Sequence, residues 1–373
     1  MRTYINAKLR ALTGAGHQAV VIAPGRADAE QEKAGGKIVW LASPVFPLDP
    51  RYRVFAGRAK LRSALIREQP DVLECSSPWT GTGVCAAWDR ARAKALFLHQ
   101  DPVAVYGETL LRGMDPSLID RLFGWYRARV RRLSAKFDVT VVGSHWYAGR
   151  LRRYGLSRVE AIPLGITREP FLTAAPDPAV RARLLAACGQ KPDARLVVAV
   201  SRHHPEKRLG TLIEACALAS SGRPLGLVIY GDGPLRGWVE RRAARAGNVH
   251  VAGFARDRRG LATAVASADA LLHGSSAETF GIAVAEALTA GTPVVMPRQG
   301  ASADMADPAC TELYDAGDSV RCAEALLRML DRAPTVGRAE VRQRAAGTVP
   351  DADDHFARLI DLYSELVRGA RGT

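Results

Sequence analysis

Short apolar runs alternate with helix-forming segments through most of this chain. In the first half, apolar runs occur at 19–24, 71–76, 95–100 and 138–144, and helical segments at about 2–14, 52–68, 81–92 and 115–135. In the second half, apolar runs occur at 195–201, 225–231, 249–254, 269–274 and 292–297, again with helical segments between them. Buried strands joined by helices are typical of a parallel sheet that is covered on both faces. The pattern predicts an α/β fold.

The length of the chain and a proline-spaced stretch near its middle predict more than one domain. A chain of 373 residues is longer than one hydrophobic core usually serves. The stretch 161–178 breaks the alternation, so we expect a first domain at 1–165 and a second at 166–350. The segment 351–373 predicts an amphipathic helix that crosses back to the first domain. Its opening Asp-Ala-Asp-Asp is typical of helix capping rather than of metal binding.

Positive charge is concentrated in the first half. The chain has 52 Lys and Arg against 38 Asp and Glu, and residues 1–165 hold 26 of the former against 14 of the latter. The excess predicts either a basic face for an anionic lipid surface or a solvated arginine-rich surface, and nucleic acid is a weaker alternative. The candidate residues are Arg51, Arg53, Arg58, Lys60, Arg62 and Arg67, and Arg121, Arg127, Arg129, Arg131, Arg132 and Lys136.

Cysteine placement and hydropathy predict a cytoplasmic protein. The six cysteines are scattered without a Cys-x-x-Cys pair, which favours buried thiols over zinc ligands or disulfides. No apolar run approaches the roughly 20 residues that span a bilayer, and the first residues carry no signal-peptide core. With the basic first half, this predicts a cytoplasmic location, peripheral on the inner face of the membrane.

Two glutamates, Glu278 and Glu286, lie in the segment 275–295. Phe280 and Gly281 follow the first glutamate and predict a loop that turns into a helix at about Ile282. The helix is expected to stop at a glycine that a proline soon follows. Exposed amides at the start of a helix favour phosphate, and carboxylates accept hydrogen bonds from hydroxyls. This arrangement suits a phosphorylated, polyhydroxylated ligand.

The sequence ETFGIAVAEALTAGTPVV at 278–295 resembles the Glu-x7-Glu signature of retaining glycosyltransferase family 4, whose members use nucleotide-sugar donors. The resemblance implies two Rossmann-like domains that face each other across a cleft, the glycosyltransferase B fold. It places Glu278 near the transferred sugar and Glu286 at the ribose hydroxyls. It also directs the backbone amides of Phe280, Gly281 and Ile282 toward the donor.

A second motif, SRHHPEKR at 201–208, follows an apolar run and resembles the family loop Gly-Arg-Leu-x-x-Glu-Lys-Gly. Ser201 and Arg208 stand where that loop has its two glycines. The resemblance assigns Arg202 and Lys207 to the donor pyrophosphate, where fixed cations stabilise the charge of the leaving group. The carboxyl end of the first strand of a Rossmann-like half is a suitable place for such a loop.

Other family positions are matched by shorter patterns. Gly231 begins a Gly-x-Gly-Pro turn that borders the donor site in the family, and Gly253 and Phe254 match the stretch beside the nucleotide base. His99 ends an apolar run and resembles the first-domain histidine that reaches the sugar, where it donates a hydrogen bond or assists proton transfer. A structural histidine at a strand end is the alternative.

The start of the chain departs from the family pattern. Family members open with a strand and a Gly-Gly loop before the helix that residues 2–14 resemble, and here both are missing. The missing strand is the central one of the first sheet. A buried sheet without it leaves unpaired backbone groups, so we expect the natural protein to extend upstream.

These observations predict a metal-independent, retaining hexosyltransferase that takes its sugar from a nucleoside-diphosphate donor. The nucleotide sugar is a substrate, and no cofactor is expected. The expected acceptor is lipid-linked, a polysaccharide or a small molecule, as in cell-envelope polysaccharide synthesis. A catalytically weak sugar-nucleotide-binding protein of the same fold is the main alternative. A basic nucleic-acid-binding protein is less favoured, because no nucleic-acid motif is present.

Overall fold

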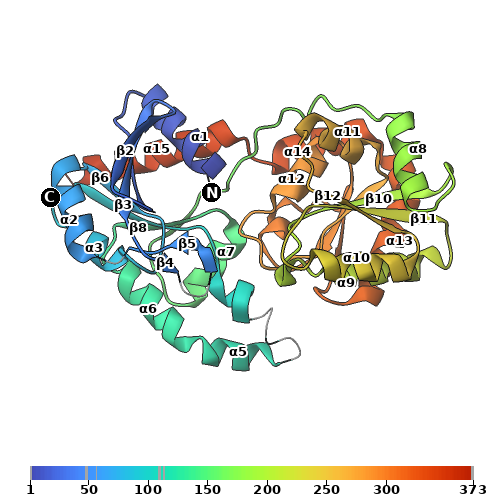
Figure 1. Cartoon of the computed structure of the whole chain (residues 1–373), viewed down its shortest axis with the longest axis horizontal. Coiled ribbons are helices and arrows are strands. Elements are labelled where there is room, and N and C mark those ends of the chain that lie inside the picture. The colour runs from blue at the N-terminus through green and yellow to red at the C-terminus, as the bar shows by residue number, and fades with distance from the viewer. Residues whose placement is uncertain (1, 47–48, 56, 108–110, 112–113, 371–373) are drawn as a thin grey trace.

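In the computed structural model of the chain, two α/β domains lie side by side, and the C-terminus lies with the first domain (Figure 1). The structure describes residues 2–46, 49–55, 57–107, 111 and 114–370. Parallel sheets form the centre of both domains, as the alternation of strands and helices predicts.

The second domain contains one six-stranded parallel sheet in the order β12-β11-β10-β13-β14-β15. Its elements are α8 (Pro178–Ala187), β10 (Arg195–Val200), η2 (Pro205–Lys207), α9 (Leu209–Ser220), β11 (Leu225–Tyr230), α10 (Arg236–Ala246), β12 (Val249–Gly253), α11 (Arg258–Ser267), β13 (Ala270–Leu272), α12 (Ile282–Thr289), β14 (Val294–Pro297), η3 (Ala301–Met305), β15 (Thr311–Tyr314), α13 (Ser319–Val336) and α14 (Arg338–Thr348). All five predicted strands of this half are present. Strand β15 and helices α13 and α14 complete the domain.

Helices cover both faces of this sheet because successive strand residues point to opposite sides. Along β10, Leu196 and Val198 join a core beneath α8, α11, α12 and α14. Val197 and Ala199 join a second core beneath α9 and α13. The continuous apolar runs in the sequence thus arise from burial on both faces.

The first domain contains shorter sheets. Its elements are α1 (Arg2–Gly14), β1 (Val20–Gly25), β2 (Ala29–Lys33), β3 (Gly36–Ala42), β4 (Val45–Phe46), β5 (Asp49–Arg53), α2 (Arg58–Glu68), β6 (Val72–Cys75), α3 (Thr82–Ala86), β7 (Ala93–Leu98), η1 (Val103–Gly107), α5 (Pro116–Leu122), α6 (Gly124–Ser134), β8 (Val139–Val142), α7 (His145–Arg153) and β9 (Val159–Ala161). Strands β6-β7-β8-β9 form a parallel sheet, β1-β3-β2 form a second sheet, and β4-β5 form a hairpin. Within the described residues, β1 and β6 each pair with a neighbour on one side only. The strands expected to share one sheet are therefore divided.

Several first-domain elements differ from the prediction. Strands β2, β3, β4 and β5 occupy a region where the sequence predicts only the beginning of a helix, and α2 starts later, at Arg58. Helix α3 ends at Ala86, well before the predicted end. The predicted long helix at 115–135 is divided into α5 and α6 at Phe123. The side chain of Arg51 lies outside the described part of the chain.

The C-terminal helix α15 (Ala352–Gly369) packs on the first domain. Its Leu359 and Tyr363 lie against Ala95 and Phe97 of β7 in one core. Asp351 caps the helix by accepting a hydrogen bond of 2.9 Å from the Asp353 amide, as the capping interpretation predicts.

The chain passes between the domains twice, and the two crossings lie side by side. The Ile166 amide donates to the Pro350 carbonyl at 3.2 Å, and the Ala352 amide donates to the Ile166 carbonyl at 3.2 Å. Gly165 makes this approach possible, because a Cβ atom there would lie 1.9 Å from the Asp351 carbonyl oxygen. The crossing segments 163–166 and 350–352 therefore depend on a residue without a side chain.

Candidate functional site

The order of strands in the second domain brings two predicted loops together. Strands β10 and β13 are neighbours in the sheet although they are far apart in the chain. The helix that follows β10 contributes to one core and the helix that follows β13 to the other. This is the switch point of a doubly wound sheet, where ligands bind at the carboxyl ends of the strands. The loop 201–208 follows β10, and the loop 273–281 follows β13.

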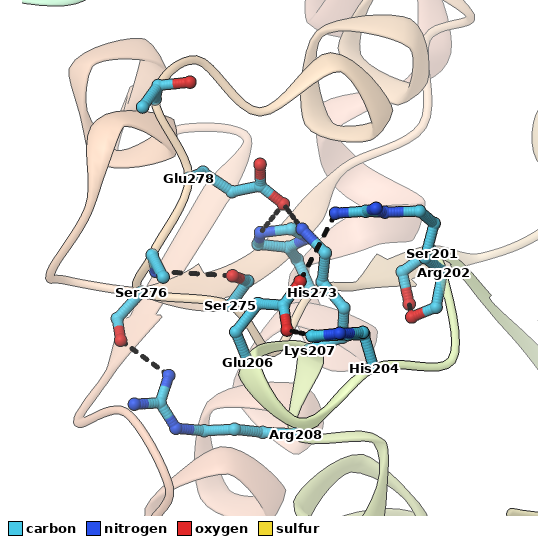
Figure 2. A network of polar contacts seen from close by, with 12 residues as sticks. Ser201, Arg202, His204, Glu206, Lys207, Arg208, His273, Ser275, Ser276 and Glu278 are labelled. Carbon is cyan, nitrogen blue, oxygen red and sulfur yellow. Dashed lines mark hydrogen bonds and ion pairs between the residues drawn. The ribbon is translucent and has the colours of Figure 1, made fainter. Parts of the chain in front are cut away.

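The two loops meet through Lys207 and Glu278, whose Nζ and Oε1 atoms form an ion pair (Figure 2). Their side chains are 11% and 21% exposed, so the pair is largely shielded from water. The Nε2 atom of His273 lies 3.8 Å from the same carboxylate oxygen. Burial alone would raise the pKa of Glu278, but Lys207 and His273 outweigh it and hold the pKa below its usual range. Glu278 is therefore an anion beside a cation.

Glu206 organises the other cation of the loop. Its buried carboxylate accepts from Arg202 Nη2 at 3.4 Å and also pairs with His204 Nδ1. The Arg202 side chain is 69% exposed, and Figure 2 shows its guanidinium group directed toward Glu206. The buried Glu206 carboxylate thus positions the guanidinium group of Arg202, which an incoming anion can reach.

Close backbone contacts keep these loops in register. Gly231 has a φ angle of 135°, and a Cβ atom there would lie 1.8 Å from the Ser201 carbonyl oxygen. A Cβ atom at Gly274 would lie 2.5 Å from the Lys207 carbonyl oxygen. Gly231 therefore borders the loop 201–208, called the cationic loop below, and only glycine permits such an approach.

Helix α12 begins where the sequence predicts. Gly281 is its N-cap with a φ angle of 97°, and Ile282 is its first residue. The Phe280 side chain belongs to the core of the domain, whereas Ile282 is 56% exposed. The Glu278 carbonyl accepts a hydrogen bond of 3.2 Å from the Ala301 amide. The loop before α12 is thus fixed at both ends.

The second glutamate lies apart from the cationic loop in its contacts. Glu286 is buried, and its Oε1 atom accepts from Arg258 Nη2 at 2.9 Å. Burial raises the pKa of Glu286, and Arg258 partly opposes this effect. Gly253 ends β12 with a φ angle of 76°, and Phe254 next to it is 70% exposed. Within the described chain, no hydrogen bond or ion pair joins Gly253 or Phe254 to Glu286 or to Glu278.

The first domain approaches the same loop through His99. Its backbone carbonyl accepts a hydrogen bond of 2.9 Å from Thr279 Oγ1, one residue after Glu278. The imidazole stacks on Phe97, with ring centroids 4.1 Å apart, and meets Tyr4 edge-on. Burial lowers the pKa of His99 to about 4, so the ring is neutral at pH 7.

The described residues contain no group of three or more His, Cys, Asp or Glu side chains placed to hold a metal ion. Nor does any helix among them have the length and apolar character needed to cross a membrane. All six cysteines are buried and free, as the sequence predicts. What the site does present is two cations and two carboxylates at the ends of adjacent parallel strands.

Two family models match the chain in succession. Residues 1–169 match Glycosyltransferase Family 4, and residues 194–332 match Glycosyl transferases group 1. A GDP-mannose-dependent alpha-mannosyltransferase of Mycobacterium tuberculosis is 30% identical over 311 residues, which cover 82% of this chain and 77% of the relative. The chain belongs to glycosyltransferase family 4. It is therefore a glycosyltransferase, and its structure has the glycosyltransferase B fold.

Further similarities agree with this assignment. A GDP-mannose-dependent alpha-(1-6)-phosphatidylinositol dimannoside mannosyltransferase of Mycobacterium tuberculosis is 29% identical over 328 residues, or 87% of this chain and 80% of the relative. A sucrose-phosphate synthase from Thermosynechococcus elongatus superimposes with a TM-score of 0.71 at 19% identity, over 98% of this chain and 93% of its own. The second similarity concerns the fold alone.

Several residues of this candidate site do not stand out in the sequence. Glu206 accepts a hydrogen bond from Arg202, and Arg258 pairs with Glu286. His273 lies near Glu278, and Arg208 and Ser276 are hydrogen-bonded to each other between the loops. The motif at 201–208 signals Glu206, because the resembled loop has Glu at that place. The pairing of Arg258 and of His273 depends on the strand order, which the motifs do not contain.

Proposed function

We propose that this glycosyltransferase transfers mannose from GDP-mannose to a lipid-linked acceptor, with retention of the anomeric configuration and without a metal ion. The observation that carries the proposal is the meeting of Lys207 and Glu278 at the switch point of the sheet, beside the exposed Arg202. The donor is suggested by the relatives whose names state that they depend on GDP-mannose.

The proposed reaction breaks the bond between the sugar C1 atom and the oxygen of the diphosphate. Arg202 and Lys207 stabilise the negative charge that develops on the departing GDP. The acceptor hydroxyl attacks C1 on the face that GDP leaves, and its proton passes to the departing phosphate oxygen. Glu278 orients the sugar and stabilises the positive charge at C1. His99, neutral at pH 7, donates a hydrogen bond to the sugar from the first domain.

On this proposal, the remaining predicted residues bind the donor. The helix start at Gly281 and Ile282, together with the amide of Phe280, faces the phosphates and sugar. Glu286 accepts the ribose hydroxyls, and Gly231, Gly253 and Phe254 border the nucleotide. The nucleotide sugar is a substrate, and no cofactor takes part.

The first domain offers a surface for the membrane that holds a lipid-linked acceptor. Leu118, Leu122 and Trp125 lie at helical spacing on α5 and α6, and with Trp79 they are 41 to 58% exposed. Arg129 donates to the Pro78 and Trp79 carbonyls at 3.1 and 3.2 Å and so holds this loop beside α6. Exposed apolar side chains near arginines are typical of contact with an anionic interface. We therefore place the enzyme at the cytoplasmic face of the membrane.

Turnover tests the function directly. With GDP-mannose and phosphatidylinositol dimannoside, we expect GDP release that EDTA does not reduce and a product with the α configuration by NMR. Lys207→Met and Glu278→Gln should each lower kcat by about 100- to 1,000-fold, whereas Lys191→Met, at an exposed lysine of the same domain, should not. Stabilisation by GDP-mannose without any GDP release would instead support the sugar-nucleotide-binding alternative.

Vesicle binding tests the proposed location. The protein should co-sediment with vesicles that contain phosphatidylglycerol and remain in the supernatant with phosphatidylcholine alone. Replacing Leu122 and Trp125 by Ser should weaken co-sedimentation, whereas Val320→Ser, at an exposed apolar residue of the second domain, should leave it unchanged. Equal binding of the surface variant and the control would refute this assignment.

A further inference from the structure

Arg208 adopts a backbone conformation that L side chains rarely occupy. Its φ and ψ angles are 46° and 40°, in the left-handed helical region. Among the described residues, only Ala34 and Gln69 share a positive φ without being glycine. The conformation is unfavourable because the Cβ atom crowds the neighbouring carbonyl oxygen, and it persists where the surroundings hold it. The family loop that this segment resembles has glycine at this place, which would adopt the conformation without strain.

The guanidinium group of Arg208 is buried between loops of the second domain. The residue is 9% exposed, and its Nη1 atom donates to Ser276 Oγ at 2.5 Å (Figure 2). Ser276 itself is 4% exposed. A Cβ atom at Gly317, after β15, would lie 3.9 Å from Cδ and Nε of Arg208. The side chain thus packs against the loops that follow β13 and β15.

Two consecutive residues of the cationic loop therefore hold two positions of the loop after β13. Lys207 pairs with Glu278, and Arg208 bonds Ser276, two residues earlier. The left-handed turn at Arg208 directs the two side chains to separate partners on one segment. The contact to Ser276 thus adds a second side-chain link between the two loops, beside the Lys207–Glu278 pair.

We propose that Arg208 is a positioning residue that fixes the segment 275–278 through Ser276 and so holds Glu278 beside Lys207 before the donor binds. Its effect on catalysis rests on the proposed function. Its effect on the loop does not, because the hydrogen bond joins two residues of the protein itself.

The experiment compares Arg208→Gly, Arg208→Lys and Ser276→Ala with the wild type. Hydrogen exchange of the amides at 277–281 is measured without ligand, and kcat and KM are measured with GDP-mannose. Arg208→Gly should speed exchange and lower kcat by about 10- to 100-fold, the range for a hydrogen bond to a charged group. Arg208→Lys should recover part of both, and Ser276→Ala should change both in the same direction as Arg208→Gly. The effect of the double variant should be smaller than the sum of the two single effects, because both changes remove the same hydrogen bond.

Gln69→Gly is the matched control, since Gln69 also has a positive φ but lies exposed at the end of α2. It should relieve the same kind of strain and change neither readout. Exchange and kcat of Arg208→Gly within about two-fold of the wild type, a difference of about 0.4 kcal/mol, would overturn the proposal. If Arg208→Gly fails to fold, Ser276→Ala decides it by the same two measurements. If the wild type does not turn over GDP-mannose, the proposed function fails, and hydrogen exchange still tests Arg208.

Discussion

Removing one partner of the Lys207–Glu278 pair should destabilise the second domain more than removing both. Lys207→Met keeps most of the side-chain volume but leaves a carboxylate that is only 21% exposed. Glu278→Gln leaves the ammonium group without its anion. In the double variant, neither charge remains to be shielded from water, and the apolar stem and the amide still fill the space. The three variants therefore separate the coupling between the loops from the loss of either side chain.

The structure supports an estimate of the size of the effect. Breaking a buried ion pair from one side costs about 3–5 kcal/mol. The partial exposure of Glu278 places Lys207→Met at the lower end, at about 3 kcal/mol. For a unit of 150–250 residues, each kcal/mol lowers Tm by about 2–4 °C, so we expect a decrease of about 6–12 °C. The coupling energy between contacting residues is about 0.5–3 kcal/mol, and we expect a value near the upper end.

Differential scanning calorimetry at pH 7 measures all three variants, with Lys191→Met as the control for loss of a lysine. The same series at lower pH tests whether the ionised form of Glu278 provides the stabilisation. The pKa of Glu278 is held below its usual range, so its contribution to stability is present above the unfolded pKa and is lost as the pH falls through the folded value. The difference between wild type and Lys207→Met should therefore shrink in acid. Additive Tm shifts, or a Lys207→Met variant as stable as the control, would refute the idea that this pair joins the two loops.

Three further predictions concern other parts of the molecule. Burial would raise the pKa of Glu74, but a paired lysine and a tyrosine lower it to about 2, so about 3 kcal/mol of stability should be lost between about pH 4.5 and 2; Glu74→Gln should remove this acid dependence in urea titrations. Gly165→Ala should destabilise the protein by about 1–3 kcal/mol, because its Cβ would meet a carbonyl of the other crossing segment, whereas Gly222→Ala, which has open space, should leave Tm unchanged. Arg258→Ala should shift the acid limb of donor binding to higher pH, because the pKa of Glu286 is already raised by burial and would lose the cation that opposes it; a pH profile of KM for GDP-mannose that matches the wild type would contradict this.

Most strands of the second domain could be predicted from the sequence because they are buried on both faces. Four of the five predicted strands, β10, β11, β13 and β14, are buried along most of their length, whereas β12 at the edge of the sheet is partly exposed. The helix start at Ile282 follows from the glycine before it. Strand β2 could not be found in this way. Its sequence, AEQEK, is exposed throughout, and the strand is held by backbone pairing with β3 rather than by an apolar face. Hydrophobic periodicity in the sequence therefore does not indicate strand β2.

The sequence indicates candidate site residues where the motif is local, and it does not indicate contacts between distant segments. Arg202 and Lys207 stand in one loop after a strand, and a motif of eight residues is enough to select them. The partner of Arg208 is 68 positions away, and the two meet only because β10 and β13 are neighbours in the sheet. A motif does not state which strands are neighbours, so the contact to Ser276 required the fold.

The residues of the candidate site come from both domains. Lys207 and Glu278 both belong to the second domain, and the loops that carry them are locked by close backbone contacts. His99 belongs to the first domain and touches this unit through the hydroxyl of Thr279. A rotation about the adjacent crossing segments would change the His99–Thr279 contact but leave the ion pair intact. Under the proposed function, the diphosphate of the donor would therefore be held by the second domain alone, whereas the hydrogen bond from His99 to the sugar would depend on the relative position of both domains.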